Sequence, residues 1–305
     1  MVGGESMTPI IFGESVIGYS HLTHDKPKQD NYLVIDENTK SSVKSRIKKY
    51  QSCYLNLPND IRIVAVSDGH GSNSCPYSDK GSQMAVNTFC DIMAYYAEKY
   101  SSDSEKNISD LFMLLNREGE AATLVKEIVT EWGNRVLKYH KLNPDVNKEP
   151  FEVDGKSNEA KIWKQYGATL LGMLISDDYI FTLQLGDGDI TFINDSTIEP
   201  VVEPEKILGV ETHSISKRKS WEKAVTKVLR LEKVEHPSMF LLSTDGFVNS
   251  HASEEEFYKT CKAYFDLSNE KGYEVIKNNL GDWLSDTSKN GCGDDITAVF
   301  VYYKV

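Results

Sequence analysis

The sequence predicts an α+β fold in which helices pack on antiparallel sheets. Short apolar runs recur along the chain, several of them separated by turn residues such as Asp-Gly. Helical periodicity is confined to separate blocks between these runs. Runs of strands followed by runs of helices favour a layered α+β architecture over an alternating parallel one. No internal repeat or Pro/Gly-rich linker divides the 305 residues, so we expect one compact unit.

The first hundred residues predict three strands and a helix. Residues 10–19 and 31–36 have the composition of strands, and IRIVAV at 61–66 suits a strand buried on both faces. A helix is expected next, with Asp79 near its N-terminus. Its apolar positions, which recur at helical spacing, are Ala85, Phe89, Ile92 and Tyr96.

Residues 37–60 lack a sustained apolar period and are rich in basic side chains. This composition predicts a solvated insertion, and a basic docking patch is the alternative interpretation. The basic residues are Lys40, Lys44, Arg46, Lys48 and Lys49.

The remainder of the chain predicts a long helical block, a group of strands, two more helices and a final strand. An Asp-Gly pair between two apolar runs is a hairpin signal, which places Asp187 at a turn on a sheet edge. The polar segment 199–237 includes KRKSWEKAVTKV, which predicts either a solvated helix face or a basic surface for an acidic partner. The expected helices are 108–139, 253–267 and 271–285, and the expected strands are 168–175, 179–185, 189–193, 238–244 and 296–303.

Composition excludes several classes of protein. The net charge is −12, which argues against nucleic-acid partners because phosphate binding needs clustered positive charge. No apolar stretch approaches the roughly 20 residues of a membrane span, and no secretory signal is visible. The five cysteines are scattered and form no Cys-x-x-Cys pair, which predicts a cytoplasmic protein without disulfides.

Five acidic residues lie where predicted strands begin or end. Carboxylates gathered on one rim of a sheet repel each other unless a cation lies between them, and oxygen ligands favour Mg²⁺ or Mn²⁺. The alternative is that each Asp-Gly pair only forms a turn. The five residues are Asp30, Asp68, Asp187, Asp245 and Asp294.

His70 directly follows Asp68-Gly69, and a histidine beside a metal site can donate a proton to a leaving oxygen. Other motifs are absent: the sequence has no phosphate-binding P-loop, no HExxH and no GxSxG. Residues 286–297 mimic a calcium-binding loop, but Thr297 replaces the glutamate that an EF-hand requires.

In order, the motifs resemble those of the metal-dependent protein phosphatases of type 2C, and the bacterial branch in particular. The similarity extends from about Phe12 to Tyr303. It is carried by GYSHLTHDKPKQDNY (18–32), AVSDGHGSNSCPYSDKGSQMAV (65–86), YGATLLGMLI (166–175), LGDGD (185–189), LLSTDGFVNS (241–250) and GDDIT (293–297).

This resemblance implies a central antiparallel β-sandwich flanked by helices, and hydrolysis of phosphoserine and phosphothreonine by a metal-activated water. It implies two Mn²⁺ or Mg²⁺ ions and a weaker third, a phosphoprotein substrate and a cognate Ser/Thr kinase as partner. His70 corresponds to the general acid. By the same correspondence, Asp68 bridges two metals, the Gly69 carbonyl binds one of them, Asp245 and Asp294 complete one site, Asp30 acts through water and Asp187 holds the third ion.

The sequence departs from the family pattern in three places. No arginine precedes Asp30 in HLTHDKPK, where the eukaryotic enzymes have one that grips the phosphate, and Lys26, Lys28 or His21 could substitute. Gly188-Asp189 replaces Ser-Arg, and Asn249 stands where many members have Asp. Two alternatives therefore stay open: a binding module without turnover, or a phosphatase for phosphoarginine or a small phosphate ester.

Overall fold

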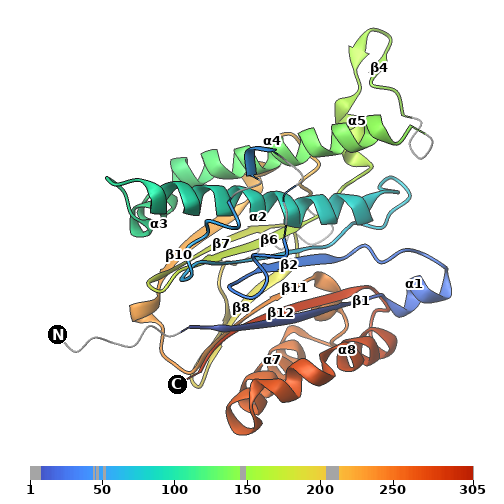
Figure 1. Ribbon diagram of the computed structural model, residues 1–305. Helices are drawn as coiled ribbons and strands as arrows, with labels where there is room; N and C mark the ends of the chain where they lie inside the picture. The colour runs from blue at the N-terminus through green and yellow to red at the C-terminus, as the bar shows by residue number, and fades with distance from the viewer. Residues whose placement is uncertain are drawn as a thin grey trace.

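Two five-stranded antiparallel sheets face each other, and helices cover the outer face of each, giving the layers α-β-β-α (Figure 1). The computed structural model describes residues 8–43, 45, 48–50, 53–144, 149–203 and 213–304. This architecture confirms the predicted fold class. None of the helices in the described part of the chain combines the length and apolar character that crossing a membrane would require.

The first sheet contains both ends of the described chain. Its strand order is β1-β12-β11-β8-β9, so the last strand lies between the first strand and β11. Helices α7 and α8 pack on its outer face. The bounds are β1 (Ile10–Val16), β8 (Asp189–Asn194), β9 (Ile198–Pro200), β11 (Ser238–Ser243), β12 (Ile296–Tyr303), α7 (Glu254–Lys271) and α8 (Tyr273–Asn290).

The second sheet has the order β10-β7-β6-β3-β2, and α2, α3 and α4 cover it. The predicted helical block 108–139 is two helices, which meet near Asn116. The bounds are β2 (Asn31–Ile35), β3 (Arg62–Ser67), β6 (Leu170–Ile175), β7 (Tyr179–Leu185), β10 (Val225–Arg230), α2 (Ser78–Ser102), α3 (Ile108–Leu115) and α4 (Glu118–Leu142).

Shorter elements connect these layers. The hairpin β4–β5 projects above α4, and helix α5 packs against α4 (Figure 1). The bounds are α1 (Tyr19–Thr23), β4 (Glu152–Val153), β5 (Lys156–Ser157), α5 (Glu159–Lys164), α6 (Asp245–Asn249) and the 3₁₀ turns Lys48–Tyr50, Ser220–Lys223 and Leu231–Lys233.

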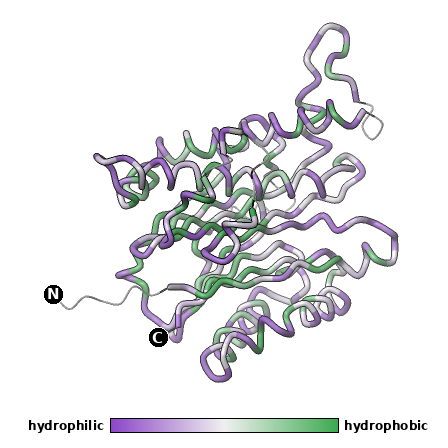
Figure 2. The backbone as a smooth tube through the Cα atoms, viewed as in Figure 1, coloured by the Kyte–Doolittle hydropathy of each residue, from purple (hydrophilic) through white to green (hydrophobic). Residues whose placement is uncertain are grey.

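Three apolar cores hold the layers together, and the alternation of side chains along β3 shows how. Ile63 and Ala65 face α2 and α4, whereas Val64 and Val66 face the opposite sheet. In Figure 2 the central strands are largely hydrophobic, and the projecting β4–β5 hairpin is mostly hydrophilic. Because β3 has no face in water, its sequence is a continuous apolar run, as expected for a strand buried on both sides.

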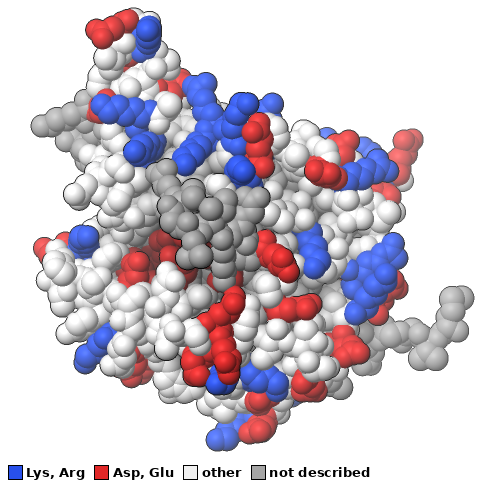
Figure 3. Space-filling view, turned by 180° about the vertical axis from the view of Figure 1, so that it is seen from behind, with Lys and Arg blue, Asp and Glu red and all other residues white. Residues whose placement is uncertain are grey.

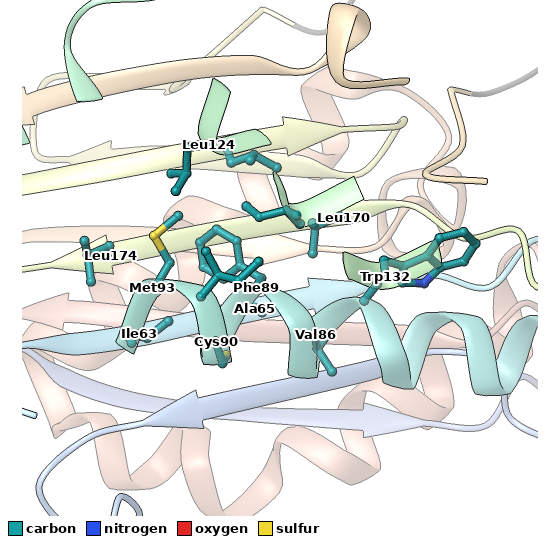
Figure 4. Packing of buried hydrophobic residues seen from close by; sticks show 14 of the residues in the cluster. Ile63, Ala65, Val86, Phe89, Cys90, Met93, Leu124, Trp132, Leu170 and Leu174 are labelled. Atoms are coloured by element: carbon teal, nitrogen blue, oxygen red, sulfur yellow. The ribbon is translucent and has the colours of Figure 1, made fainter. Parts of the chain in front are cut away.

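The helix-side core is built around side chains of α2 that pack on β3 and β6 (Figure 4). Phe89 lies over Gly172, where an added Cβ would come within 2.3 Å of the aromatic ring. The lack of a side chain in the middle of β6 therefore allows α2 to approach the sheet closely.

The Asp187 turn differs from its prediction. Strand β7 belongs to one sheet and β8 to the other, so Gly186-Asp187-Gly188 joins the two sheets and does not close a hairpin. Gly186 has a φ of 119°, which favours glycine and lets the chain change direction. Asp187 consequently lies at the end of the sandwich, within reach of residues from both sheets.

Three other local predictions need correction. The predicted strand 10–19 ends at Val16 and is followed by helix α1. The expected solvated insertion buries Tyr50, Tyr54 and Leu57 against the helix-side core. The segment interpreted as a helix face ends in strand β10, whose exposure alternates at an open edge.

Candidate metal centre and active site

One end of the sandwich gathers the carboxylates that the sequence singled out. They come from the ends of β3, β7 and β11 and from the residues that precede β2 and β12, so both sheets contribute. A depression of about 300 Å³ opens between them. Its lining comprises His21, Gln29, Asp68, Gly69, His70, Gly71, Ser72, Asp187, Asp245 and Asp294.

Asp30 lies below this surface and is 1% exposed. Its Oδ2 accepts hydrogen bonds from the hydroxyls of Thr244 (2.7 Å) and Thr297 (2.8 Å), which belong to the opposite sheet's strand ends. Its Oδ1 is buried with no hydrogen-bond donor. A buried carboxylate oxygen without a donor is costly, so this atom is available to a water or a cation.

Asp68 is positioned by its own backbone at the end of β3. Its amide donates to Thr169 Oγ1 (2.9 Å), and its carbonyl accepts from the Thr169 amide (2.8 Å). These bonds use backbone atoms of Asp68, and the residue lines the depression. The hydrogen bonds to Thr169 that hold Asp68 in place therefore involve its amide and carbonyl groups and not its carboxylate.

Asp245 and Asp294 come from the other sheet. Asp245 begins α6, and the Asn249 amide donates to its Oδ2 (3.0 Å). Asp294 Oδ1 accepts from the Asp295 amide (2.8 Å), and its side chain is 53% exposed. Asp187 is also exposed, at the turn between the sheets. The depression thus has an open rim at Asp187 and Asp294, and Asp30 is buried next to the lining residue Asp68.

Gly69 and His70 continue directly from Asp68 along the wall of the depression. A Cβ on Gly69 would come within 2.6 Å of the Ser78 carbonyl oxygen, so only glycine fits between β3 and α2. The His70 amide donates to the Gly167 carbonyl (3.2 Å). A Cβ on Gly167 would come within 2.8 Å of the His70 ring. These tight contacts hold the imidazole beside the carboxylates.

The carboxylates repel one another, and the pKa values reflect this. Burial, followed by the Asp295 charge, raises the pKa of Asp30 to about 7. Burial, then Asp187 and Asp294, raises the pKa of Asp245 to about 7. Burial and the charges of Asp30 and Asp245 raise the pKa of Asp68 well above its ordinary value. Each raised pKa means that, without a bound cation, the protein disfavours the ionised form of that carboxyl group.

The donor set therefore fits a divalent cation. It offers carboxylate oxygens from both sheets, and one of them, the buried Oδ1 of Asp30, has no hydrogen-bond donor. No cysteine of the described residues lines the depression. Hard oxygen ligands of this kind suit Mg²⁺ or Mn²⁺. A cation would offset the repulsion that raises these pKa values.

Reasoning from the sequence missed Asp295 and named His21 only as one of three possible substitutes for the missing arginine. Asp295 is buried, and its carboxylate accepts from the amides of Gly18 (2.6 Å) and Gln29 (2.5 Å). His21 donates to the same carboxylate through Nδ1 (2.9 Å) and lines the depression. The only sequence signal was the doubled Asp in GDDIT, together with the position of His21 shortly before Asp30.

The predicted basic surfaces are partly engaged within the protein. Lys40 donates to the Leu57 carbonyl, and Lys49 pairs with Glu127 (3.2 Å); Lys44 and Arg46 lie outside the described residues. Arg218 pairs with Glu159 and lies over Trp163. Figure 3 shows Lys and Arg side chains gathered in the upper part of the rear face, on the side of α4 and α5.

Comparisons with known proteins agree with this geometry. The profile of the family described as Protein phosphatase 2C matches residues 49–285. No curated protein sequence matches the chain. All the solved structures compared below are less than 25% identical to this chain, so their likeness establishes the fold.

Three solved phosphatases illustrate the likeness. A bacterial serine phosphatase has a TM-score of 0.57 at 13% identity, covering 98% of this chain and 100% of that one. The Staphylococcus aureus serine/threonine phosphatase Stp1 has a TM-score of 0.55 at 11% identity, covering all of both chains. The S. agalactiae serine/threonine phosphatase has a TM-score of 0.54 at 14% identity, covering 97% and 100%.

The profile match covers more than half of the chain, and the α-β-β-α fold and the order of the motifs agree with it. This chain belongs to the protein phosphatase 2C family.

Proposed function

We propose that this chain hydrolyses phosphoserine and phosphothreonine in proteins with the help of Mn²⁺ or Mg²⁺. One observation carries the proposal: Asp30, Asp68 and Asp245 meet at the end of the sandwich with raised pKa values, and His70 lines the same depression. Family membership supports phosphatase chemistry, and the acidic cluster supports metal dependence.

The proposed ligand roles follow the positions of the donors. Asp68 lies between the side chains of both sheets and would bridge two ions, with the Gly69 carbonyl beside it. Asp245 and Asp294 would complete one ion, and the buried Asp30 would act through a water. Asp187, on the exposed rim, would hold a third and weaker ion.

Bound ions of this kind neutralise phosphoryl oxygens and lower the pKa of a water between them. The chain's own residues perform the remaining tasks. Asp30 holds a hydrogen-bonded water through Oδ1, because its Oδ2 is already engaged by Thr244 and Thr297. The His70 imidazole gives a proton to the departing serine or threonine oxygen. No side-chain nucleophile is required.

We also propose that the chain is one phosphatase domain, with residues 37–60 and 199–237 as its insertions. Its partners would be a phosphoprotein and the cognate Ser/Thr kinase. All five cysteines lie in the described residues and are free thiols, which supports a reducing compartment such as the cytoplasm.

The test is phosphate release from a phosphothreonine peptide, measured with Mn²⁺ and with EDTA. We expect release that depends on Mn²⁺ and that falls at least about 100-fold in Asp68→Asn, since the site loses a charged ligand. Equal release in EDTA would contradict the proposal. A parallel assay with phosphoarginine and a small phosphate ester identifies the substrate class.

A second candidate is a binding module without turnover. No Lys or Arg lines the depression among the described residues, so a phosphate would lack the guanidinium grip that the family resemblance implies. Binding of Mn²⁺ by calorimetry, combined with no release from any phosphoester, would favour this candidate.

A further inference from the structure

A second cavity, of about 680 Å³, lies away from the depression and beside strand β10; we call it the edge cavity. Strand β10 is last in the order of its sheet, so within the described part of the chain it is paired on the β7 side alone. In an antiparallel sheet, alternate residues of such a strand direct their amide and carbonyl groups toward the unpaired edge. Those backbone groups form a template for another strand.

The lining shows that the edge cavity follows this unpaired edge. Val228 packs against the helix-side core, whereas Leu229 packs against the core between the sheets, so these neighbours belong to opposite faces of β10. Both line the edge cavity. Because β7 occupies the other edge, one cavity can touch both faces only by passing the unpaired one. An extended segment in this position would direct alternate side chains to either face of the sheet.

Apolar side chains line the edge cavity on both sides of that edge. On the helix side, Met113 is 46% exposed, and the ring of Tyr179 stacks on Phe112 with 5.4 Å between centroids. On the side of the opposite sheet, Phe192 packs against Phe240 with 5.1 Å between centroids. Of these residues, Met113, Tyr179 and Phe192 belong to the lining. The edge cavity therefore offers apolar contacts as well as backbone groups, which together bind a peptide by strand addition.

The wall formed by β10 and the 3₁₀ turn after it is basic, although the net charge of the chain is −12. Its cations are Lys227, Arg230 and Lys233. Lys227 donates to the Val201 carbonyl (2.9 Å), and Arg230 lies 3.3 Å from Glu232. For Lys233 the described residues provide no ion-pair partner. The acidic lining residues are Glu199, on β9, and Glu235, after the turn. The excess of cations on the β10 side favours carboxylates in an added strand.

A second copy of this chain fits the edge cavity less well than an acidic partner does. Two copies paired through β10 would bring Lys227 and Arg230 of both into one seam, and like charges across paired strands are destabilising. Carboxylates on a different strand would meet the same side chains favourably.

Protection from aggregation is the alternative role for a lysine on an edge strand. That role accounts for Lys227. It requires neither the apolar walls nor the further cations at Arg230 and Lys233, so it leaves most of the edge cavity unexplained.

We propose that the edge cavity binds an extended acidic segment of a partner protein, which adds a strand to the unpaired edge of β10. The inference goes beyond the proposed function, because it needs neither metal nor turnover. The seven residues of β7 lead from the edge cavity to the turn at Asp187, a distance of about 20 Å. A partner anchored here would leave the depression open, and anchoring raises the effective concentration of a phosphorylated residue elsewhere in the same partner.

The decisive variant is Ser196→Trp. Ser196 is exposed in the turn between β8 and β9 and lines the edge cavity, so an indole at this position would obstruct it. The matched control is Asp195→Trp, which adds the same side chain one exposed residue earlier, outside the lining. Thermal unfolding checks that both variants are folded.

A second pair of variants tests the charge without adding bulk. Lys227→Gln and Lys233→Gln together remove two cations from the lining. The control is Lys271→Gln with Lys277→Gln, which neutralises two exposed lysines on α7 and α8, on the other sheet.

The probe is a short fluorescein-labelled peptide that alternates valine and glutamate, and a control peptide carries lysine in place of glutamate. Fluorescence anisotropy measures binding to the full chain. We expect saturable binding of the acidic peptide alone, weakened by about tenfold or more in Ser196→Trp and by about three- to tenfold in the Lys227 and Lys233 variant. Both control variants should bind within about twofold of the wild type.

Hydrogen exchange measured by mass spectrometry tests whether a strand is added. Exchange in residues 225–230 should slow by about tenfold when the acidic peptide is bound, because amides at the unpaired edge become hydrogen-bonded.

Three results would overturn the inference. If the acidic peptide does not bind saturably, or binds Ser196→Trp as tightly as the wild type, the edge cavity is not its site. If it binds without slowing exchange in residues 225–230, the contact is electrostatic and no strand is added. If the wild type sediments as a dimer without peptide and Ser196→Trp as a monomer, the occupant is a second copy. Because no measurement involves metal or turnover, these outcomes are distinct from failure of the proposed function.

Discussion

Asp91 and the aspartates at the end of the sandwich lie in opposite surroundings. On α2, Asp91 is 2% exposed and accepts from Tyr54 (2.6 Å) and Ser45 (2.9 Å), and Arg135 of α4 pairs with it at 2.8 Å. At the end of the sandwich, the charges of Asp30 and Asp245 act on Asp68, and among the residues that the structure describes no Lys or Arg lines the depression.

The difference separates structural acids from functional ones. Burial raises the pKa of Asp91, but Arg135 and the hydroxyls oppose that rise, and the protein itself supplies the balancing charge. At the other cluster the neighbouring carboxylates add to the rise. A buried acid whose charge is balanced by its own chain is part of the architecture. A group of acids without that balance indicates that a cation from solution completes the site.

The largest effect tests whether the unbalanced cluster performs chemistry. We expect His70→Ala to lower kcat by about 10²–10⁴-fold, the usual contribution of a general acid. Binding of Mn²⁺ should be retained, because the carboxylates are intact. Steady-state kinetics with a phosphothreonine peptide, together with Mn²⁺ calorimetry, measure both quantities. An unchanged kcat would assign the proton to another group.

The next prediction compares one substitution in each cluster. Asp91→Asn should cost about 1.5–3 kcal/mol of unfolding free energy, because Arg135 loses its bond to the buried Asp91 carboxylate and keeps only its pair with Glu131. Asp68→Asn in EDTA should instead raise the melting temperature by about 2 °C or more, because it removes repulsion between carboxylates. Chemical and thermal unfolding of the metal-free proteins provide the two values. If both variants destabilised the metal-free protein by the same amount, the two clusters would not differ in how their charge is balanced.

A smaller effect concerns pH. The pKa values of Asp30 and Asp245 are raised from 3.8 to about 7, so the metal-free folded state holds protons more tightly than the unfolded state. The stability from these groups is complete below about pH 4 and is lost as the pH rises through 7. Addition of Mn²⁺ should therefore raise the melting temperature more at pH 8 than at pH 6. Equal increases at both pH values would contradict this linkage.

The smallest effect is expected at the basic segment beside α5. Arg218 already pairs with Glu159, and Lys219 lies 3.5 Å from Glu222. Neutralising Lys217, Arg218 and Lys219 together should change kcat/KM for an acidic phosphopeptide by only about two- to fivefold, since exposed pairs contribute little. The loss should shrink at high salt. If every phosphoprotein is turned over at the wild-type rate, the segment does not dock substrate.

The sequence predicted those parts of the site that are local. Asp68 and Asp245 each follow a buried apolar strand, and that pattern is visible in a few consecutive residues. The partners of Asp30 are not local, because Thr244 and Thr297 are more than 200 residues away in the chain. Only the folded sheets bring these hydroxyls together.

The fold class was predictable, but the division of strands between the sheets was not. An Asp-Gly turn has the same sequence whether it closes a hairpin or joins two sheets, so the turn at Asp187 was assigned to the wrong connection. Strand β10 was hidden among charged residues because one side of it is exposed at an edge. Tyr50 and Tyr54 were overlooked because the residues around them are polar.

The central position of β12 has a consequence for the synthesis of the protein. This strand pairs with both β1 and β11, and the residues just before it supply Asp294 and Asp295. A nascent chain still lacking β12 therefore has no partner for β1, leaves one edge of β11 open and has no carboxylate to anchor Gly18 and Gln29. The depression can therefore form only after residues 293–303 have left the ribosomal tunnel and β12 has paired with β1 and β11.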